Sequence, residues 1–163
     1  YIGAHNDWDI NFYQNREKHL DRKQILKLVD AGWEMGSHGC HHHAYTGLKY
    51  SEIYADMAVS KERIENMIDK EVQSFTAPFN AMVPVIFPIA EELGYKYIFY
   101  QKPLSKTNYN CTKVNVVERR SVYSIDATVN LIKKIQNNSR YETYKENIIH
   151  FCSNATIGVK ELI

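Results

Sequence analysis

The sequence Gly36-Ser37-His38-Gly39-Cys40-His41-His42-His43 holds four of the seven histidines of this 163-residue chain. It follows the short run Trp33-Glu34-Met35, and we predict a strand over residues 33–37 that ends in this turn. Neutral imidazole is the commonest protein metal ligand, and two or three converging imidazoles suit zinc or a similar first-row ion. The turn therefore predicts a divalent-metal site, with a solvated polar loop as the alternative.

Within the turn, His38 and His42 are the favoured metal-ligand pair. They are four residues apart, so a helical turn would place both rings on one face, within reach of one ion. A catalytic metal needs about three protein ligands and an open position. His5, Asp7 and Asp9, which follow a predicted strand end at residues 1–3, are candidates for the third ligand, although ordinary loop residues are the simpler interpretation.

Composition places the chain in the class of single globular domains, spanning residues 1–163. It is 44% hydrophobic and has a net charge of +1 with no large charged block. This balance gives no electrostatic case for binding nucleic acid or an anionic membrane. No apolar run is long enough to span a bilayer. The three cysteines are an odd number without close spacing, which argues against a disulfide framework and a cysteine-based zinc ribbon.

The rest of the chain alternates short apolar strands with amphipathic helices. We predict helices over residues 22–30, 52–69, 83–93 and 126–136, capped by Asp21, Ser51 and Asp126 where a cap is visible. Further strands are expected over residues 72–75, 95–100, 114–117 and 147–151. Strands separated by helices of this length indicate repeated βα units, hence an α/β fold with a mostly parallel sheet.

Chemistry in such folds collects at the carboxyl ends of the strands, where His38, Pro78 and His150 all fall. His150 could act as a general acid near neutral pH, or be a buried core histidine. The segment Pro78-Phe79-Asn80 could form one wall of a substrate groove, or be a plain turn with Asn80 in a left-handed conformation. Arg119 and Arg120 could hold a carboxylate, or be solvated surface residues.

Residues 32–42 resemble the second motif of the polysaccharide deacetylases, the family-four carbohydrate esterases with a NodB-like domain. That motif reads Gly-x-Glu-[Ile/Met]-Gly-Ser-His-[Thr/Gly]-x-x-His, and the match is close. Residues 74–80 are similar to the third motif, and residues 90–97 continue it in the usual way. Residues 148–150, followed by 157–162, are similar to the last motif, a histidine at a strand end before a helix.

The resemblance implies an irregular (β/α) barrel and hydrolysis of an N-acetyl group from an acetylated glycan of the N-acetylglucosamine type. It implies a divalent metal, most often zinc, held by His38 and His42, and His150 as the acid that protonates the leaving amine. Pro78, Phe79 and Asn80 are then expected to bind substrate. The location implied is extracellular or the cell envelope, whereas the oligomeric state stays open.

The chain departs from the family pattern at two places. The first motif, Thr-Phe-Asp-Asp, which supplies the base and the third ligand, has no match here, and Thr76 stands where many members carry an arginine. Residues 1–3 read like the end of a strand and residues 159–163 like the start of a helix, so we expect a barrel incomplete at both ends. Two interpretations stay open, a partial sequence of an active enzyme and a degenerate carbohydrate-binding relative; an O-acetyl esterase differs only in substrate.

Overall fold

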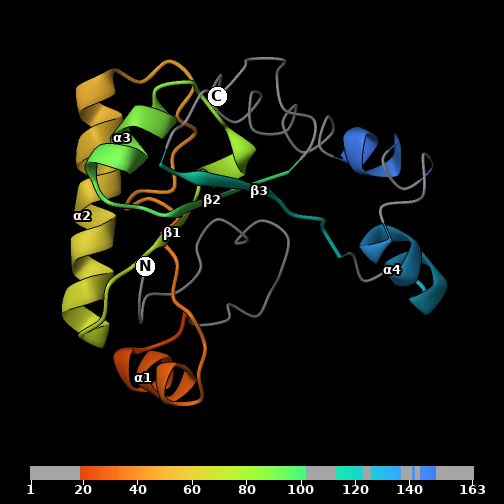
Figure 1. Cartoon of the computed structure of the whole chain (residues 1–163), viewed down its shortest axis with the longest axis horizontal. Helices are drawn as coiled ribbons and strands as arrows, with labels where there is room; N and C mark the ends of the chain where they lie inside the picture. The colour runs from red at the N-terminus through yellow and green to blue at the C-terminus, as the bar shows by residue number, and fades with distance from the viewer. Residues whose placement is uncertain (1–18, 102–112, 123–125, 137–140, 142–143, 150–163) are drawn as a thin grey trace, which may run out of the picture.

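The computed structural model describes residues 19–101, 113–122, 126–136, 141 and 144–149 (Figure 1). Helices and strands follow one another in the order α1 (Arg22–Asp30), α2 (Tyr50–Ile68), β1 (Ser74–Thr76), η1 (Pro78–Asn80), α3 (Ile86–Glu92), β2 (Tyr97–Tyr100), β3 (Asn115–Glu118) and α4 (Thr128–Ile135). Residues 144–149 are also helical. The described part thus keeps the expected alternation of strands and helices.

The three strands form one parallel sheet in the order β1-β2-β3. Thr76, Phe99 and Val117 lie at the same level of this sheet, near its carboxyl edge. Ser37 adds a single parallel bridge to Phe75, on the free side of β1. The predicted α/β class with mostly parallel strands is confirmed, and the arrangement is that of a partial (β/α) barrel.

Helices α2 and α3 pack on one side of the sheet and bury the core against it (Figure 1). Ile53 and Met57 of α2, Phe75 of β1, Ile98 of β2 and Ile86 of α3 are almost fully buried. Each such side chain removed from water stabilises the fold by roughly 1.5–3 kcal/mol. This packing fixes α2 against β1, the two elements between which the histidine-rich turn lies in space.

Helix starts follow local signals only in part. Asp21 caps α1 as predicted, because its carboxylate accepts the backbone N–H of Gln24 at 2.8 Å. Helix α2 begins one residue before the predicted cap Ser51, and Glu52 instead accepts the N–H of Lys49 at 2.7 Å. Asp126 does not cap α4, whose N-cap is Ala127.

Two predicted strands are wrong in the described residues. Residues 33–36 are irregular and only Ser37 pairs with β1, so the expected strand over 33–37 shrinks to one bridge. Residues 147–149 are helical rather than extended. A short apolar run cannot be told from a buried helical segment by pattern alone, which is the reason for the second error.

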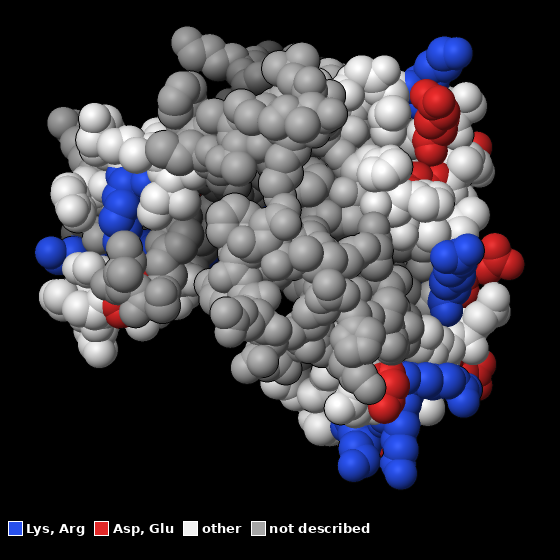
Figure 2. Space-filling model, turned by 180° about the vertical axis from the view of Figure 1, so that it is seen from behind, with Lys and Arg blue, Asp and Glu red and all other residues white. Residues whose placement is uncertain are grey.

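Charges of both signs are interspersed on the described surface seen in Figure 2, and the densest group of basic side chains lies near α1. That group includes Arg22, Lys23 and Lys27 of α1, with Asp30 beside them. Among the described helices, none is both long and apolar enough to cross a membrane.

Candidate metal and active site

The histidine turn, defined as residues 36–43, leaves the sheet edge at Ser37 and reverses direction at once. Ser37 donates its N–H to the carbonyl of Ser74 at 2.8 Å, and its own carbonyl accepts the N–H of Thr76 at 3.0 Å. Gly39 (φ +77°) and His42 (φ 53°) both adopt left-handed conformations, which glycine tolerates at no steric cost. The reversal brings His38 and His42 to the carboxyl edge of β1.

His38 is oriented by the main chain of β1. Its Nδ1–H donates to the Thr76 carbonyl at 2.7 Å, which leaves Nε2 as the lone-pair nitrogen of the neutral ring. Metal-ligating histidines almost always donate their second ring nitrogen to such an acceptor. His38 therefore has the tautomer that a metal ligand requires.

His42 lies beside His38, with their ring centroids 5.0 Å apart. Two imidazoles at zinc–nitrogen distances of about 2.0–2.1 Å in a tetrahedral site have ring centroids about 5 Å apart. The predicted pair is thus brought together at a spacing that fits one ion. The ring of Phe79 packs 4.6 Å from that of His42 on the other side.

Both imidazoles favour the neutral form. Burial lowers the pKa of His38, the hydrogen bond to Thr76 opposes this effect, and the charge of Arg119 adds to it. Burial also lowers the pKa of His42, reinforced by His38 and His43. Because metal ligation needs an unprotonated nitrogen, these shifts favour ion binding at neutral pH.

The far side of the turn is attached to α2 through Asp56. This carboxylate accepts the backbone N–H groups of Cys40 (3.0 Å) and His41 (3.1 Å), the Nδ1–H of His41 (2.7 Å) and the hydroxyl of Tyr45 (2.7 Å). Burial acts to raise the pKa of Asp56, but the hydrogen bonds from Tyr45, His41 and Cys40 outweigh it and lower the pKa. Asp56 is therefore a charged residue on the inner face of a helix.

Cys40, His41 and Asp56 are also a potential metal-ligand cluster within the described residues, because their ligand atoms lie within 4.8 Å of one another. Four donors already occupy the lone pairs of Asp56, and the guanidinium of Arg63 contacts the Cys40 sulfur at 3.1 Å. A cation at this point would displace both the His41 proton and Arg63.

The expected groove segment Pro78-Phe79-Asn80 follows β1 as a short 3-10 turn. Pro78 is buried, Phe79 contacts His42, and Asn80 adopts the left-handed conformation with φ 56°. The Asn80 side chain binds the backbone of Gln101 through both its amide nitrogen and its oxygen. Asn80 therefore ties this turn to the end of β2, and its contact with substrate stays a prediction.

A cavity of about 240 Å³ opens beside His38, lined by residues 36–38 and 74–76 and by Arg119. Arg119 follows β3 directly, and partial burial lowers the pKa of its guanidinium. Within the described part of the chain, no hydrogen bond or ion pair involves this guanidinium. Arg120 instead joins Glu118 and Glu146, so the two neighbouring arginines have different surroundings.

His150, the predicted acid, lies outside the described residues, as do His5, Asp7 and Asp9. The described part of the site thus consists of two imidazoles, an aromatic wall, a cavity and one cation.

Comparison with known proteins now decides the family. The family model described as Polysaccharide deacetylase matches residues 4–98. The chain belongs to the polysaccharide deacetylase family. A comparison with curated proteins finds no match.

Three solved structures share the fold of this family member. The Streptococcus pyogenes deacetylase PplD in complex with acetate has a TM-score of 0.60 and 17% identity over 71% of this chain and 50% of its own. The polysaccharide deacetylase BC0361 from Bacillus cereus has a TM-score of 0.61 and 17% identity over 73% and 37%. A de-N-acetylase from Aggregatibacter actinomycetemcomitans has a TM-score of 0.59 and 12% identity over 82% and 59%. The chain therefore spans 37–59% of the length of these proteins.

Asp56 and Tyr45 were not predicted from the sequence, and the sequence left open which of Arg119 and Arg120 faces the site. For Asp56 a signal existed, because it lies between the apolar residues Ile53 and Met57 of α2 and four residues before Ser60. An acid and a hydroxyl on the inner stripe of an amphipathic helix indicate buried polar contacts. For Arg119 no local signal separates it from Arg120.

Proposed function

We propose that this chain is part of a metal-dependent hydrolase that removes N-acetyl groups from a polysaccharide of the N-acetylglucosamine type. The proposal rests on one observation: the ring centroids of His38 and His42 lie 5.0 Å apart, and the His38 Nδ1–H donates to the Thr76 carbonyl. Membership of the polysaccharide deacetylase family supports carbohydrate deacetylation as the general reaction.

His38 and His42 would hold the divalent ion, for which zinc is the expected identity. A zinc ion bound there supplies Lewis-acid polarisation of the acetyl carbonyl and a water of lowered pKa. Thr76 keeps the His38 ring in the ligating tautomer, and Phe79 covers one face of His42 and restricts water on that side. These residues orient the site before substrate arrives.

Residues near His38 and His42 are proposed to bind the substrate and to assist the reaction. Phe79 and Asn80 form the proposed wall of the glycan groove, with Pro78 buried next to Phe79, and the cavity next to Arg119 is proposed to receive the acetyl group. Arg119 would stabilise the negative charge that develops on the acetyl oxygen, since a cation in a partly desolvated site is suited to that task. His150 is proposed to protonate the amine as it leaves. Acetylated glycans of the extracellular space or cell envelope are the expected substrates.

The direct test measures bound zinc and released acetate on the full-length protein that contains this chain. His38→Ala and His42→Ala should each remove the bound zinc and lower acetate release more than about 100-fold, since losing only an outer-shell partner already costs 10–100-fold. His43→Ala is the matched control on the same turn and should keep both. Undiminished zinc in both ligand variants would refute the proposal.

One observation favours a second candidate, a carbohydrate-binding relative without catalysis: Thr76 stands where many members carry an arginine. This candidate predicts glycan binding without acetate release, and metal-dependent release removes it. The same assay with O-acetylated and N-acetylated oligosaccharides separates an O-acetyl esterase from the proposed amidase.

A further inference from the structure

We propose that Asp56 is a positioning residue of the metal site, which holds the histidine turn in the conformation that brings His38 and His42 together. This inference rests on the proposed function, because it assigns to Asp56 a role in metal affinity. Asp56 is distant from the turn in sequence and comes from the inner face of α2, where it is 8% exposed.

The first support is the set of hydrogen bonds. Asp56 receives the two consecutive backbone N–H groups of Cys40 and His41, which lie between His38 and His42 in the chain. A carboxylate that accepts two adjacent main-chain donors fixes the path of the backbone as well as a side chain. The ligand residues on either side of these donors are thereby constrained.

The second support is a further anchor from the same helix. Ser60, one helical turn after Asp56, lies with its hydroxyl 2.8 Å from that of Ser37, the residue before His38. Helix α2 thus holds the chain immediately before His38 through Ser60 and again before His42 through Asp56. Helix α2 packs against the sheet, so both anchors hold the turn in a fixed position relative to β1. The Thr76 carbonyl at the end of β1 binds His38.

The third support is the space at Gly39. A Cβ atom there would lie 2.6 Å from Asp56 Oδ2 and 2.9 Å from the hydroxyl of Tyr45. The turn therefore approaches the carboxylate more closely than any other residue type would allow. Tyr45 is fully buried, and its O–H donates to the same oxygen, so the carboxylate is itself held in place.

The test measures zinc affinity of the full-length protein by competition with a chromophoric chelator. Asp56→Asn removes the charge at almost constant size, and Tyr45→Phe removes one donor to Asp56. We expect Asp56→Asn to weaken zinc binding about 10-fold or more, as outer-shell changes commonly do, and Tyr45→Phe to weaken it less. Glu65→Gln is the matched control, because Glu65 is on α2 but binds Lys61 and Val72.

A purely structural role is separated from positioning by a second measurement. Thermal unfolding in a chelator gives the stability of each metal-free variant, and amide hydrogen exchange follows the Cys40 and His41 N–H groups in the same metal-free protein. Asp56→Asn should speed exchange of these two amides, and Glu65→Gln should leave them protected even where it lowers stability. Zinc affinity of Asp56→Asn within twofold of the wild type, or unchanged exchange, would overturn the inference.

Cys40→Ser distinguishes this role from direct ligation. If Cys40, His41 and Asp56 were themselves the metal centre, Cys40→Ser would lower the zinc content per chain, and the positioning role would be refuted. We expect the zinc content to stay unchanged. A wild-type protein that binds no zinc would refute the proposed function and the metal role of Asp56 together, whereas the exchange data would still report whether Asp56 holds the turn.

Discussion

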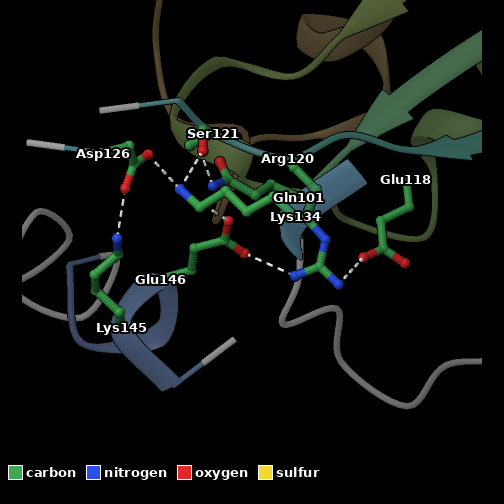
Figure 3. A network of polar contacts seen from close by, with 8 residues as sticks. All are labelled: Gln101, Glu118, Arg120, Ser121, Asp126, Lys134, Lys145 and Glu146. Carbon is green, nitrogen blue, oxygen red and sulfur yellow. Dashed lines mark hydrogen bonds and ion pairs between the residues drawn. The ribbon is translucent and has the colours of Figure 1, made fainter. Parts of the chain in front are cut away.

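Two polar clusters of this protein lie at the ends of different strands of the same sheet and use their charges in different ways. The charge network, shown in Figure 3, joins the end of β3 to α4 and the helix at 144–149. Its members are Gln101, Glu118, Arg120, Ser121, Asp126, Lys134, Lys145 and Glu146. At the histidine turn, in contrast, the pKa values of His38 and His42 are lowered, and His38 lines a cavity together with Arg119, whose guanidinium has no partner in the described residues.

Within the described residues, the charge network pairs cations with carboxylates. Asp126, with a side chain 0% exposed, accepts from Lys134 and Lys145 at 2.5 Å each. Arg120 donates to Glu146 at 2.9 Å, and its other nitrogen lies 3.3 Å from Glu118. Three cations thus face three carboxylates, and buried charges paired in this way hold elements together. In the histidine turn His38 lines the cavity, and because its Nδ1–H is held by Thr76, its Nε2 carries the lone pair of the neutral ring.

The position of a residue at a strand end does not by itself decide which of the two clusters it joins. Arg119 and Arg120 are neighbours, yet Arg119 lines the cavity and Arg120 neutralises Glu146. Successive residues of an extended chain point to opposite sides, so one arginine enters the site and the other the network. The following predictions test this division, from the largest expected effect on stability to the smallest.

Lys134→Met should lower the free energy of unfolding by about 4 kcal/mol, because it removes one of the two lysines that lie 2.5 Å from the buried carboxylate of Asp126. Chemical denaturation monitored by circular dichroism measures the change. Lys133→Met, one residue earlier and exposed, is the control and should cost less than about 0.5 kcal/mol. Equal effects of the two variants would show that the network adds no stability.

Gly39→Ala should lower the free energy of unfolding by about 3 kcal/mol, since the new methyl group would collide with Asp56 and Tyr45 at a left-handed position. Gly47→Ala is the control for backbone strain alone, because φ is +83° there and nothing lies within 4 Å of the added Cβ. A Gly39 variant no less stable than the Gly47 variant would contradict the close approach.

Asp56→Asn should lower the free energy of unfolding by about 2 kcal/mol at pH 7, which is within the range for hydrogen bonds to a charged group. The pKa of Asp56 is lower in the folded state than the ordinary value of about 3.9, so the carboxylate stabilises the fold above about pH 4 and loses this effect as the pH falls further. Urea unfolding at pH 7 and pH 3 should show the gap between wild type and variant shrinking in acid. An equal difference at both pH values would mean that the charge of Asp56 does not cause the loss of stability in the variant.

Arg119→Met should change the free energy of unfolding by less than about 0.5 kcal/mol, because its guanidinium is partly exposed and holds no described partner. The same variant should lower kcat/KM for deacetylation roughly 10-fold or more through lost stabilisation of developing charge. Arg120→Met should show the reverse, lost stability with activity retained in the folded fraction. Steady-state kinetics beside denaturation curves provide both values.

Local patterns in the sequence predict much of the fold but little of the site's support. Helix α1, capped by Asp21, lies where its apolar spacing predicts it, and the parallel order of the strands follows from the alternation of elements. Helix α4 is different, because it buries Lys134 while Val129, Ile132 and Ile135 are 55%, 48% and 84% exposed. The positions of the apolar residues therefore do not reveal which face of α4 is buried. Lys134 lies on the buried face because its partners Asp126 and Glu146 come from other segments of the chain.

The sequence by itself determined the α/β class and singled out His38 and His42 as the predicted ligand pair, because helix periodicity and the turn motif can be recognised from neighbouring residues. Only the tertiary structure decided that the Thr76 carbonyl orients His38, that Asp56 binds the turn, and that Arg119 rather than Arg120 faces the cavity. The physical reason is distance along the chain. Thr76 is 38 residues from His38 and Asp56 is 16 from Cys40, and such contacts form only when strand β1 and helix α2 pack together.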